Sequence, residues 1–316
     1  MSEGPQVAAV VVTWNRRDLL AESLEAIRGA TRPPDAVVVV DNASTDGTPE
    51  VVANRFPEVD LVRLPINLGG AGGFAAGIER ALERHRPDLI WLLDDDTVPR
   101  PGALAALLST RSRYPGHPPP AVLASRVVWT DGRDHPMNTP RRKLGAHRDE
   151  IRRAGQVGAV SIRSASFVSI ALDAGAVRER GLPVADYFLW NDDFEYTTRL
   201  LRGRVGLLCP DSVVVHKTRT FGATDTDPGE RFWYEVRNKV WLFTRSPGLN
   251  PLERVIYLGS TLRRWAVTFA ASSDRTTLRR ALGRGLVAGV RRGPRATADV
   301  LAAVPAAPNP GRPGHG

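Results

Sequence analysis

The first hundred residues repeat one unit, in which a short, continuous apolar run is followed by a segment with helical apolar spacing. The runs do not alternate apolar and polar positions, so both of their faces should be buried, as in a parallel sheet covered by helices on each side. We therefore predict an α/β fold. The predicted strands span 7–12, 36–40, 59–64 and 89–93, and the predicted helices span 16–27, 46–56, 71–85 and 101–114.

Polar side chains directly follow the predicted strands. Ligands of such sheets bind beyond the carboxyl ends of the strands, so these side chains are expected to lie at one site. They are Thr13, Asn15, Asp41, Asn67, Asp94, Asp95 and Asp96.

The pattern is less regular after residue 120, where strands, helices and a polar stretch rich in arginine, glycine and proline follow one another. We interpret the polar stretch, residues 130–156, as a long loop. The other predicted elements are strands over 121–129 and within 157–173 and 205–216, helices over 192–201 and 230–245, two helices within 251–292, and a disordered end over 305–316.

Composition and charge exclude several classes of protein. The 316 residues are 42% hydrophobic, enough for a sizeable core, and the single cysteine, Cys209, excludes an intrachain disulfide or a multi-cysteine zinc cluster. The net charge is +9, but eleven arginines against three acids give residues 251–316 a net +8 and leave the first 250 residues at +1. This near-neutral body argues against a nucleic-acid-binding protein, which the basic pI alone would suggest.

No signal peptide begins the sequence, and no apolar run reaches 18 residues. A cytoplasmic protein, or one at a membrane surface, is therefore expected. The helices predicted within 251–292 interleave arginines with apolar side chains, a combination that suits an anionic membrane surface. The alternative is a helical appendage packed on the core with solvated arginines.

Three consecutive carboxylates, Asp94, Asp95 and Asp96, follow the predicted fourth strand. They repel one another, and a divalent cation would remove that repulsion; Mg²⁺ and Mn²⁺ prefer such oxygen ligands. Because alternate residues point the same way, Asp94 and Asp96 are expected to share an ion while Asp95 faces elsewhere. His216, which ends a β-branched run, is a candidate third ligand.

Two further segments could carry chemistry. The glycine-rich run at residues 67–75 precedes a helix and would let a ligand approach the backbone closely, and it also fits a loose dinucleotide-binding pattern that would suit a nicotinamide-dependent oxidoreductase. Asp192 and Asp193 open a predicted helix, where they are either capping residues or a general base.

Taken together, these segments resemble the family 2 glycosyltransferases, which have the nucleotide-sugar-binding GT-A fold. The resemblance is carried, in family order, by residues 10–16, 38–47, 67–74, 94–96 and 192–193. Within the family, the glycine run, the aspartate triplet and residues 231–238 are most similar to bacterial galactofuranosyltransferases of cell-wall assembly, with rhamnosyltransferases nearby.

The resemblance implies roles for individual residues. Asp94, Asp96 and His216 would hold the metal, Asp193 would be the catalytic base, and Trp190 and Asp192 would line the acceptor site. The residues implied to bind the nucleotide-sugar are Thr13, Asn15, Arg16, Asp41, Asn67, Gly69, Gly70 and Asp95.

The resemblance also implies domains and a reaction. Residues 1–220 would form the catalytic domain, with a nucleotide-binding part to about 115 and an acceptor part after it, followed by a basic helical region at 221–300 and a disordered tail at 301–316. The reaction would be an inverting, Mn²⁺- or Mg²⁺-dependent transfer of a sugar to a glycan or polyprenyl-linked acceptor. Galactofuranose from UDP-galactofuranose is the first candidate, and rhamnose from dTDP-rhamnose or another hexose in a secondary metabolite is the alternative.

Overall fold

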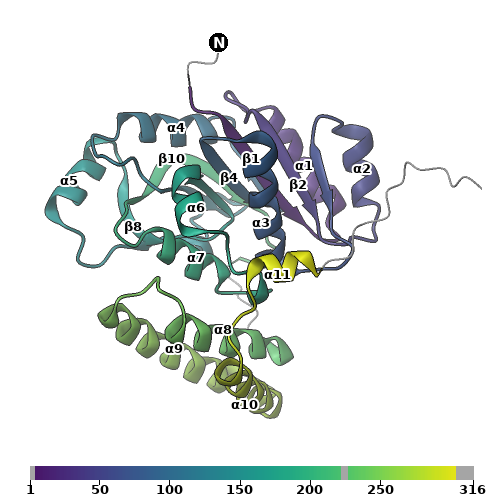
Figure 1. Cartoon of the computed structure of the whole chain (residues 1–316), viewed down its shortest axis with the longest axis vertical. Helices are drawn as coiled ribbons and strands as arrows, with labels where there is room; N and C mark the ends of the chain where they lie inside the picture. Colours follow the sequence, from purple (N-terminus) through teal and green to yellow (C-terminus); the bar gives the residue numbers. More distant parts are fainter. Residues whose placement is uncertain (1–3, 222–226, 304–316) are drawn as a thin grey trace, which may run out of the picture.

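A computed structural model describes residues 4–221 and 227–303. Its strands form one mixed sheet in the order β3-β2-β1-β4-β9-β6-β10-β8-β7, with β5 paired to β10 (Figure 1). The strands are β1 (Val7–Thr13), β2 (Ala36–Asp41), β3 (Asp60–Arg63), β4 (Leu89–Asp94), β5 (Thr97–Pro99), β6 (Val122–Val128), β7 (Arg141–Arg142), β8 (Val160–Ser164), β9 (Ser169–Asp173) and β10 (Gly206–His216).

The helices of the described residues lie on both faces of this sheet and in a layer beyond one of its edges (Figure 1). They are α1 (Arg17–Arg28), α2 (Thr48–Arg55), α3 (Gly69–Arg80), α4 (Ala103–Arg113), α5 (Arg148–Gln156), α6 (Ala174–Arg180), α7 (Asp192–Leu200), α8 (Phe232–Thr244), α9 (Pro251–Ala271), α10 (Arg275–Arg291) and α11 (Thr297–Ala302).

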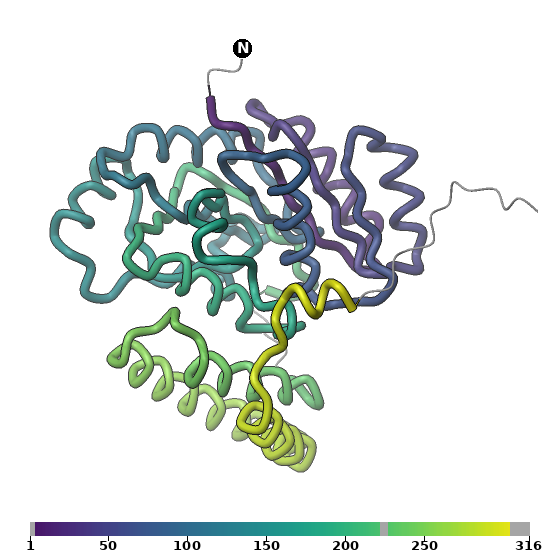
Figure 2. Tube along the Cα trace, viewed as in Figure 1, coloured from purple at the N-terminus to yellow at the C-terminus, as the bar shows by residue number. Residues whose placement is uncertain are grey.

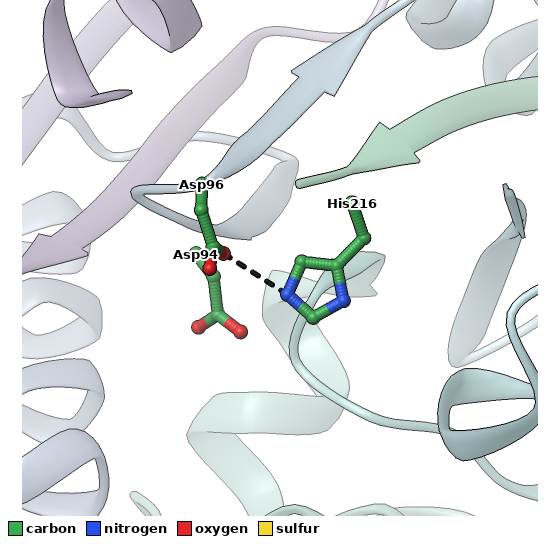
Figure 3. A group of neighbouring side chains, drawn as sticks. All are labelled: Asp94, Asp96 and His216. Atoms are coloured by element: carbon green, nitrogen blue, oxygen red, sulfur yellow. Dashed lines mark ion pairs between the residues drawn. The ribbon is translucent and has the colours of Figure 1, made fainter. Parts of the chain in front are cut away.

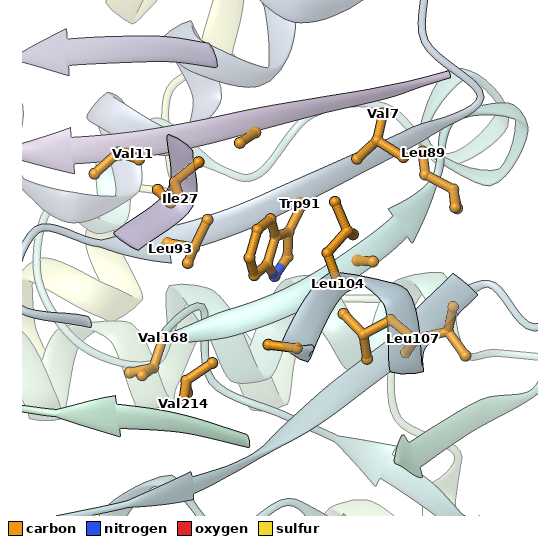
Figure 4. Packing of buried hydrophobic residues seen from close by; sticks show 14 of the residues in the cluster. Val7, Val11, Ile27, Leu89, Trp91, Leu93, Leu104, Leu107, Val168 and Val214 are labelled. Carbon is orange, nitrogen blue, oxygen red and sulfur yellow. The ribbon is translucent and has the colours of Figure 1, made fainter. Parts of the chain in front are cut away.

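Both faces of the sheet are covered, which explains the absence of alternation in the strands. Val11 of β1 joins a core cluster with α1, α2 and α4, whereas its neighbour Val10 joins another with α3, α6 and α7. Trp91 lies in the first cluster, fully buried among aliphatic side chains (Figure 4), and its indole donates a hydrogen bond to Ser169 Oγ at 3.0 Å. The predicted α/β fold is therefore confirmed.

The parallel sheet predicted for the first hundred residues is also observed, because β1, β2, β3 and β4 pair in parallel. Beyond them β9 runs antiparallel between β4 and β6, so the complete sheet is mixed. Strand β4 is therefore the last of the parallel strands, and the sheet continues beyond it with β9, β6 and β10.

The loop predicted for residues 130–156 is wrong over its last part, where α5 forms. The His147 side chain caps the first turn of α5, accepting a hydrogen bond from the Asp149 amide at 3.3 Å. Glu150 anchors the helix by accepting a hydrogen bond from Lys143 at 2.7 Å and another from Ser161. The charge-rich composition suggested a loop, but these contacts and the buried Ala154 stabilise a helix.

The C-terminal helices α8, α9 and α10 form a layer beside the sheet domain, as Figure 1 and the backbone trace in Figure 2 show. Gly285 and Gly289 of α10 lie against Val236 and Val240 of α8, where an added Cβ would come within 3 Å of each valine. The two predicted helices within 251–292 are thus confirmed. In the described residues, no helix is both long enough and apolar enough to cross a membrane.

Helix α11 returns from this layer to the sheet domain and contacts α3. Arg295, just before it, forms an ion pair with Asp186 at 2.8 Å, and Thr297 accepts a hydrogen bond from the Ala185 amide at 3.2 Å. Leu301 and Ala302, which were expected in a disordered tail, belong to this helix. The rest of that tail, residues 304–316, lies outside the described residues.

Candidate active site

The carboxyl ends of three parallel strands bring their polar residues together. In the register of the sheet, Thr13 of β1 lies opposite Asp41 of β2, and Val12 lies opposite Asp94 of β4. Thr13 and Asp41 are both almost completely buried, each with 1% of its surface exposed. Burial raises the pKa of Asp41, and hydrogen bonds from Ser44 oppose that shift.

His216 reaches the aspartate triplet through strand pairing. Strand β5 turns back immediately after Asp96 and pairs antiparallel with the end of β10, which places His216 opposite Thr97. One possible ligand atom from each of Asp94, Asp96 and His216 then lies within 4.8 Å of the others (Figure 3). His216 Nε2 is 3.0 Å from Asp96 Oδ1.

Asn138 orients the His216 ring, and no sequence pattern indicated this contact. Asn138 Oδ1 lies 2.9 Å from His216 Nδ1, and its amide nitrogen donates to Ser166 Oγ at 3.1 Å. In this structure Nε2 donates to Asp96; with Nδ1 donating to Asn138, a neutral imidazole would leave the Nε2 lone pair for a cation between the aspartates. This is the arrangement that metal-binding histidines usually have.

The three carboxylates differ in their electrostatics. Burial, and then the charge of Asp96, raises the pKa of Asp94 to about 7. Burial raises the pKa of Asp95 to about 6, against the opposing effect of Arg16. Burial would also raise the pKa of Asp96, but the hydrogen bond and charge of His216, together with Arg16, hold it below its usual value.

The donor set of this cluster fits a divalent cation. Two carboxylates and a neutral imidazole suit Mn²⁺ and also Mg²⁺, which prefers oxygen ligands. Bringing Asp94 and Asp96 together without a cation is costly, as the raised pKa of Asp94 indicates. Asp95 Oδ1 lies 3.1 Å from Arg16 Nη1 and its Oδ2 lies 3.4 Å from the Trp14 amide, and the same Arg16 nitrogen also contacts Asp96.

The loops that follow β1 and β2 are hydrogen-bonded to each other. Asn15, at φ 52°, receives a hydrogen bond from the Thr45 amide at 2.7 Å and donates its own amide to Ser44 Oγ at 2.9 Å. Asn15 and Arg16 line an outer cavity of about 350 Å³, together with Asp96 and Lys217. Asn15 therefore organises these loops as well as lining a cavity.

The glycine-rich run forms the start of α3, where it lies against Phe188. Asn67 Oδ1 accepts a hydrogen bond from the Gly69 amide at 2.7 Å. Gly69 has φ +69°, and a Cβ there would lie 2.0 Å from the Phe188 carbonyl oxygen, so only glycine fits. A Cβ at Gly70 would meet no atom within 4 Å, because Gly70 faces a cavity.

The acid pair opens α7 after a strained turn. Phe188, Trp190 and Asn191 have φ between 63° and 66°, a region that residues other than glycine rarely adopt. Asn238 of α8 holds this turn, since its amide nitrogen lies within 3.0 Å of the carbonyl oxygens of Tyr187, Leu189 and Trp190. Arg237 donates to the carbonyls of Asp186 and Tyr187. Helix α8 thus positions the turn.

A central cavity of about 620 Å³ is lined both by the strand-end cluster and by the turn that precedes α7. Its lining includes six residues predicted from the sequence: Gly70, Asp94, Trp190, Asp192, Asp193 and His216. It also includes Asn138, Arg141, Phe188 and Arg264, which sequence reasoning missed. The predicted residues Thr13, Asp41, Asn67, Gly69 and Asp95 are not part of its lining; they lie at or next to the strand ends and the start of α3.

Asp192 and Asp193 lie in surroundings that raise the pKa of both carboxyl groups. Burial raises the pKa of Asp193, against the opposing charges of Lys239 and Arg141. Burial, followed by the charge of Asp193, raises the pKa of Asp192 further, and Asp94 adds to that shift. Asp192 and Asp193 line the same cavity as Asp94.

A mixed sheet with an acidic cluster at the ends of its parallel strands, beside a large cavity, is the arrangement expected of a glycosyltransferase with the GT-A fold. The chain matches the family model "Glycosyl transferase family 2" over residues 8–168, and it belongs to that family. The resemblance noted from the sequence motifs is therefore confirmed, and the dinucleotide-like glycine run belongs to a glycosyltransferase.

Two curated relatives come from Mycobacterium tuberculosis. Galactofuranosyltransferase GlfT1 is 33% identical over 264 residues, which cover 78% of this chain and 84% of the relative. An N-acetylglucosaminyl-diphospho-decaprenol L-rhamnosyltransferase is 34% identical over 113 residues, 34% of this chain and 37% of the relative.

Solved structures with low sequence identity share the fold. S. aureus TarS 1-349 in complex with UDP-GlcNAc is 16% identical and has a TM-score of 0.63, covering 90% of this chain and 81% of that one. A mannosyltransferase from Pyrobaculum calidifontis, in complex with GDP-Man and Mn²⁺, is 20% identical with a TM-score of 0.52, covering 95% and 79%.

Proposed function

We propose that this glycosyltransferase transfers a sugar from a nucleoside diphosphate donor to an acceptor hydroxyl by an inverting, single-displacement reaction. The observation that carries the proposal is the shared cavity, which Asp94 and His216 line on one side and Asp193 lines on the other. A donor at the acidic cluster and a base at Asp193 would then flank the same space.

The donor half would bind the nucleotide-sugar with the residues at the strand ends. Thr13, Asn15, Arg16, Asp41 and Asn67 are the proposed nucleotide-binding residues, Gly69 and Gly70 would approach the diphosphate, and Asp95 would contact the ribose or the sugar. A divalent cation held by Asp94, Asp96 and His216 would neutralise the charge that develops on the departing nucleoside diphosphate. GT-A neighbours solved with Mn²⁺ support a cation of this kind.

Asp193 would remove the proton of the acceptor hydroxyl as that oxygen attacks the anomeric carbon. Its raised pKa makes it a stronger base than an exposed aspartate. Trp190 and Asp192, on the same turn and helix start, would position the acceptor. No covalent sugar–enzyme intermediate is required.

Asp193→Asn tests the role of the base. We expect turnover to fall by about 100- to 10,000-fold, with metal-dependent nucleotide binding unchanged, because Asp193 lies on the acceptor side. Asp211→Asn, an exposed change on β10, is the matched control and should leave turnover unchanged. Full turnover by Asp193→Asn would refute the assignment.

The donor is proposed to be UDP-galactofuranose, because the galactofuranosyltransferase relative is matched over most of both chains. The acceptor is proposed to be a glycan or a polyprenyl-linked glycan. The second candidate is dTDP-rhamnose, which the shorter rhamnosyltransferase match supports. Hydrolysis and transfer assays with a panel of nucleotide-sugars and Mn²⁺ would separate them.

We also propose that the C-terminal helices contact an anionic membrane, on the inner face of the plasma membrane, where a lipid-linked acceptor would be found. Val255 and Leu262 share one face of α9 and are 69% and 54% exposed, with Arg263 beside them. Flotation with anionic vesicles should weaken in a Val255→Gln, Leu262→Gln variant. It should not weaken in Leu144→Gln, where the replaced side chain is 71% exposed elsewhere. Equal flotation of all three proteins would refute this contact.

A further inference from the structure

A second cavity adjoins the central one on the acceptor side. It has a volume of about 320 Å³ and shares Asn138, Arg141, Asp193 and Arg264 with the central cavity. Its charged lining consists of three cations, Arg141, Lys239 and Arg264, and one carboxylate, Asp193. We call it the basic cavity. The residues that line it come from β7 and the segment before it, α7, α8 and α9.

Lys239 is a buried cation that points into this cavity. Only 7% of the residue is exposed, and its ammonium nitrogen lies 5.2 Å from the centre of the Phe194 ring. Burial lowers the pKa of Lys239 to about 8, although the charge of Glu235 opposes that shift. A bound anion would stabilise the charged form of this side chain.

Glu235 does not balance all three cations. It already receives hydrogen bonds from Arg264 at 2.5 Å, from Asn191 at 2.6 Å and from Trp265 at 3.2 Å. Arg141 contacts aromatic rings instead, 5.5 Å from Phe194. In the described part of the chain, neither Arg141 nor Lys239 forms an ion pair of 4.0 Å or less. Because Asp193 is the one carboxylate among the described residues of the lining, the three cations leave the cavity with a net positive charge.

We propose that the basic cavity binds a phosphate or diphosphate group of the acceptor. The proposal rests on the function given above, because it takes Asp193 as the base that faces the acceptor hydroxyl. An acceptor hydroxyl at Asp193 would place the neighbouring part of the same molecule in the basic cavity. Arg141 and Arg264 offer planar donor groups and Lys239 a point charge, which are the side chains that bind phosphate groups.

The donor's diphosphate is the other possible source of such an anion. Asp94, His216 and Gly70 line the central cavity but not the basic cavity. A diphosphate held at the acidic cluster therefore lies in the central cavity, which Arg141 and Arg264 also line, whereas Lys239 lines only the basic cavity. This separation assigns the basic cavity to the acceptor.

Titration with inorganic pyrophosphate, in EDTA and at moderate salt, tests the cavity without a metal-bound nucleotide. We expect the parent to bind, and Arg141→Gln and Lys239→Met each to weaken binding by about tenfold or more. Arg142→Gln and Lys143→Met are the matched controls. Arg142 is the exposed neighbour of Arg141 on β7, and Lys143 pairs with Glu150 at 2.7 Å outside the cavity. Because Arg141 is itself exposed, its substitution should not impair folding.

A second set of titrations, with UDP and with dTDP in the presence of Mn²⁺, separates this proposal from the proposed function. We expect all four variants to bind the nucleotide as the parent does. Failure of the parent to bind either nucleotide would contradict the proposed donor site, whether or not the parent binds pyrophosphate. The basic cavity is refuted if the parent does not bind pyrophosphate or if the controls weaken it equally. It is also refuted if Arg141→Gln and Lys239→Met weaken nucleotide binding as much as pyrophosphate binding.

Discussion

The two halves of the central cavity have opposite electrostatic character. The donor half gathers Asp94, Asp95 and Asp96 at the end of one strand, and burial raises the pKa of the first two. The acceptor half brings Arg141 and Lys239 close to Asp193. The first therefore suits a cation and the second an anion. Under the proposed function, this difference would let one cleft hold two negatively charged substrates with Asp193 between them.

The halves also differ in how their residues are held. Strand pairing fixes the donor half, because the register of β5 and β10 sets His216 beside Asp96. In the acceptor half, a turn with positive φ angles is held by Asn238 from a helix 40 or more positions later in the sequence. Substitutions in each half should therefore fail in different ways.

The largest expected effect is in the donor half. Asp96→Ala should weaken metal-dependent nucleotide binding by about 100-fold or more, because only two of the three proposed ligands, Asp94 and His216, would remain. Isothermal titration of UDP with and without Mn²⁺ measures the loss. Nucleotide binding equal to the parent's and insensitive to chelator would contradict the metal site.

Asn238→Ala tests the acceptor half. Three backbone carbonyls would lose their shared donor, so we expect a loss of about 1–3 kcal/mol in stability and a kcat about tenfold to 100-fold lower. Nucleotide binding should be unchanged. Asn250→Ala, which removes the N-cap of α9, is the control: it should cost about 1 kcal/mol without lowering kcat. An equal kcat in both variants would show that Asn238 is only structural.

Asn138→Ala should have a smaller effect than Asp96→Ala, because it removes the partner of His216 rather than a ligand. Such partners usually contribute about tenfold to 100-fold in metal affinity. Titration of Mn²⁺ by electron paramagnetic resonance measures this. A wild-type affinity would mean that the His216 ring is oriented without Asn138.

The smallest expected effect is on the pH dependence of the donor half. The pKa of Asp94 is raised to about 7, so a proton competes with Mn²⁺ below that pH. Mn²⁺ affinity should therefore fall as the pH drops through about 7 and become nearly constant above it. Asp94→Asn should remove much of this dependence. A flat profile in the parent would show that Asp94 does not take part.

The donor half could be predicted from the sequence because its signals are local. An apolar run that stops at a polar residue marks the end of a strand, which is why Thr13, Asp41 and Asp94 could be placed at the carboxyl ends of β1, β2 and β4. His216 followed from the same pattern.

The acceptor half could not be predicted in the same way. Arg141 and Asn138 lie in a stretch interpreted as loop, and the pairing of β7 with β8 places that stretch beside the cavity. Asn238 and Lys239 belong to a helix whose packing no local pattern fixes. The segment 231–238 did resemble relatives, but the resemblance did not show that Asn238 holds the turn before Asp192.

The most direct measurement is a crystal structure of the protein with Mn²⁺ and UDP, with the ion located by anomalous scattering. The proposed function predicts the ion at about 2.1 Å from carboxylate oxygens of Asp94 and Asp96, bound to the UDP diphosphate, with Asp193 facing the same cavity. An ion and nucleotide bound elsewhere, or Asp193 directed away from them, would contradict it.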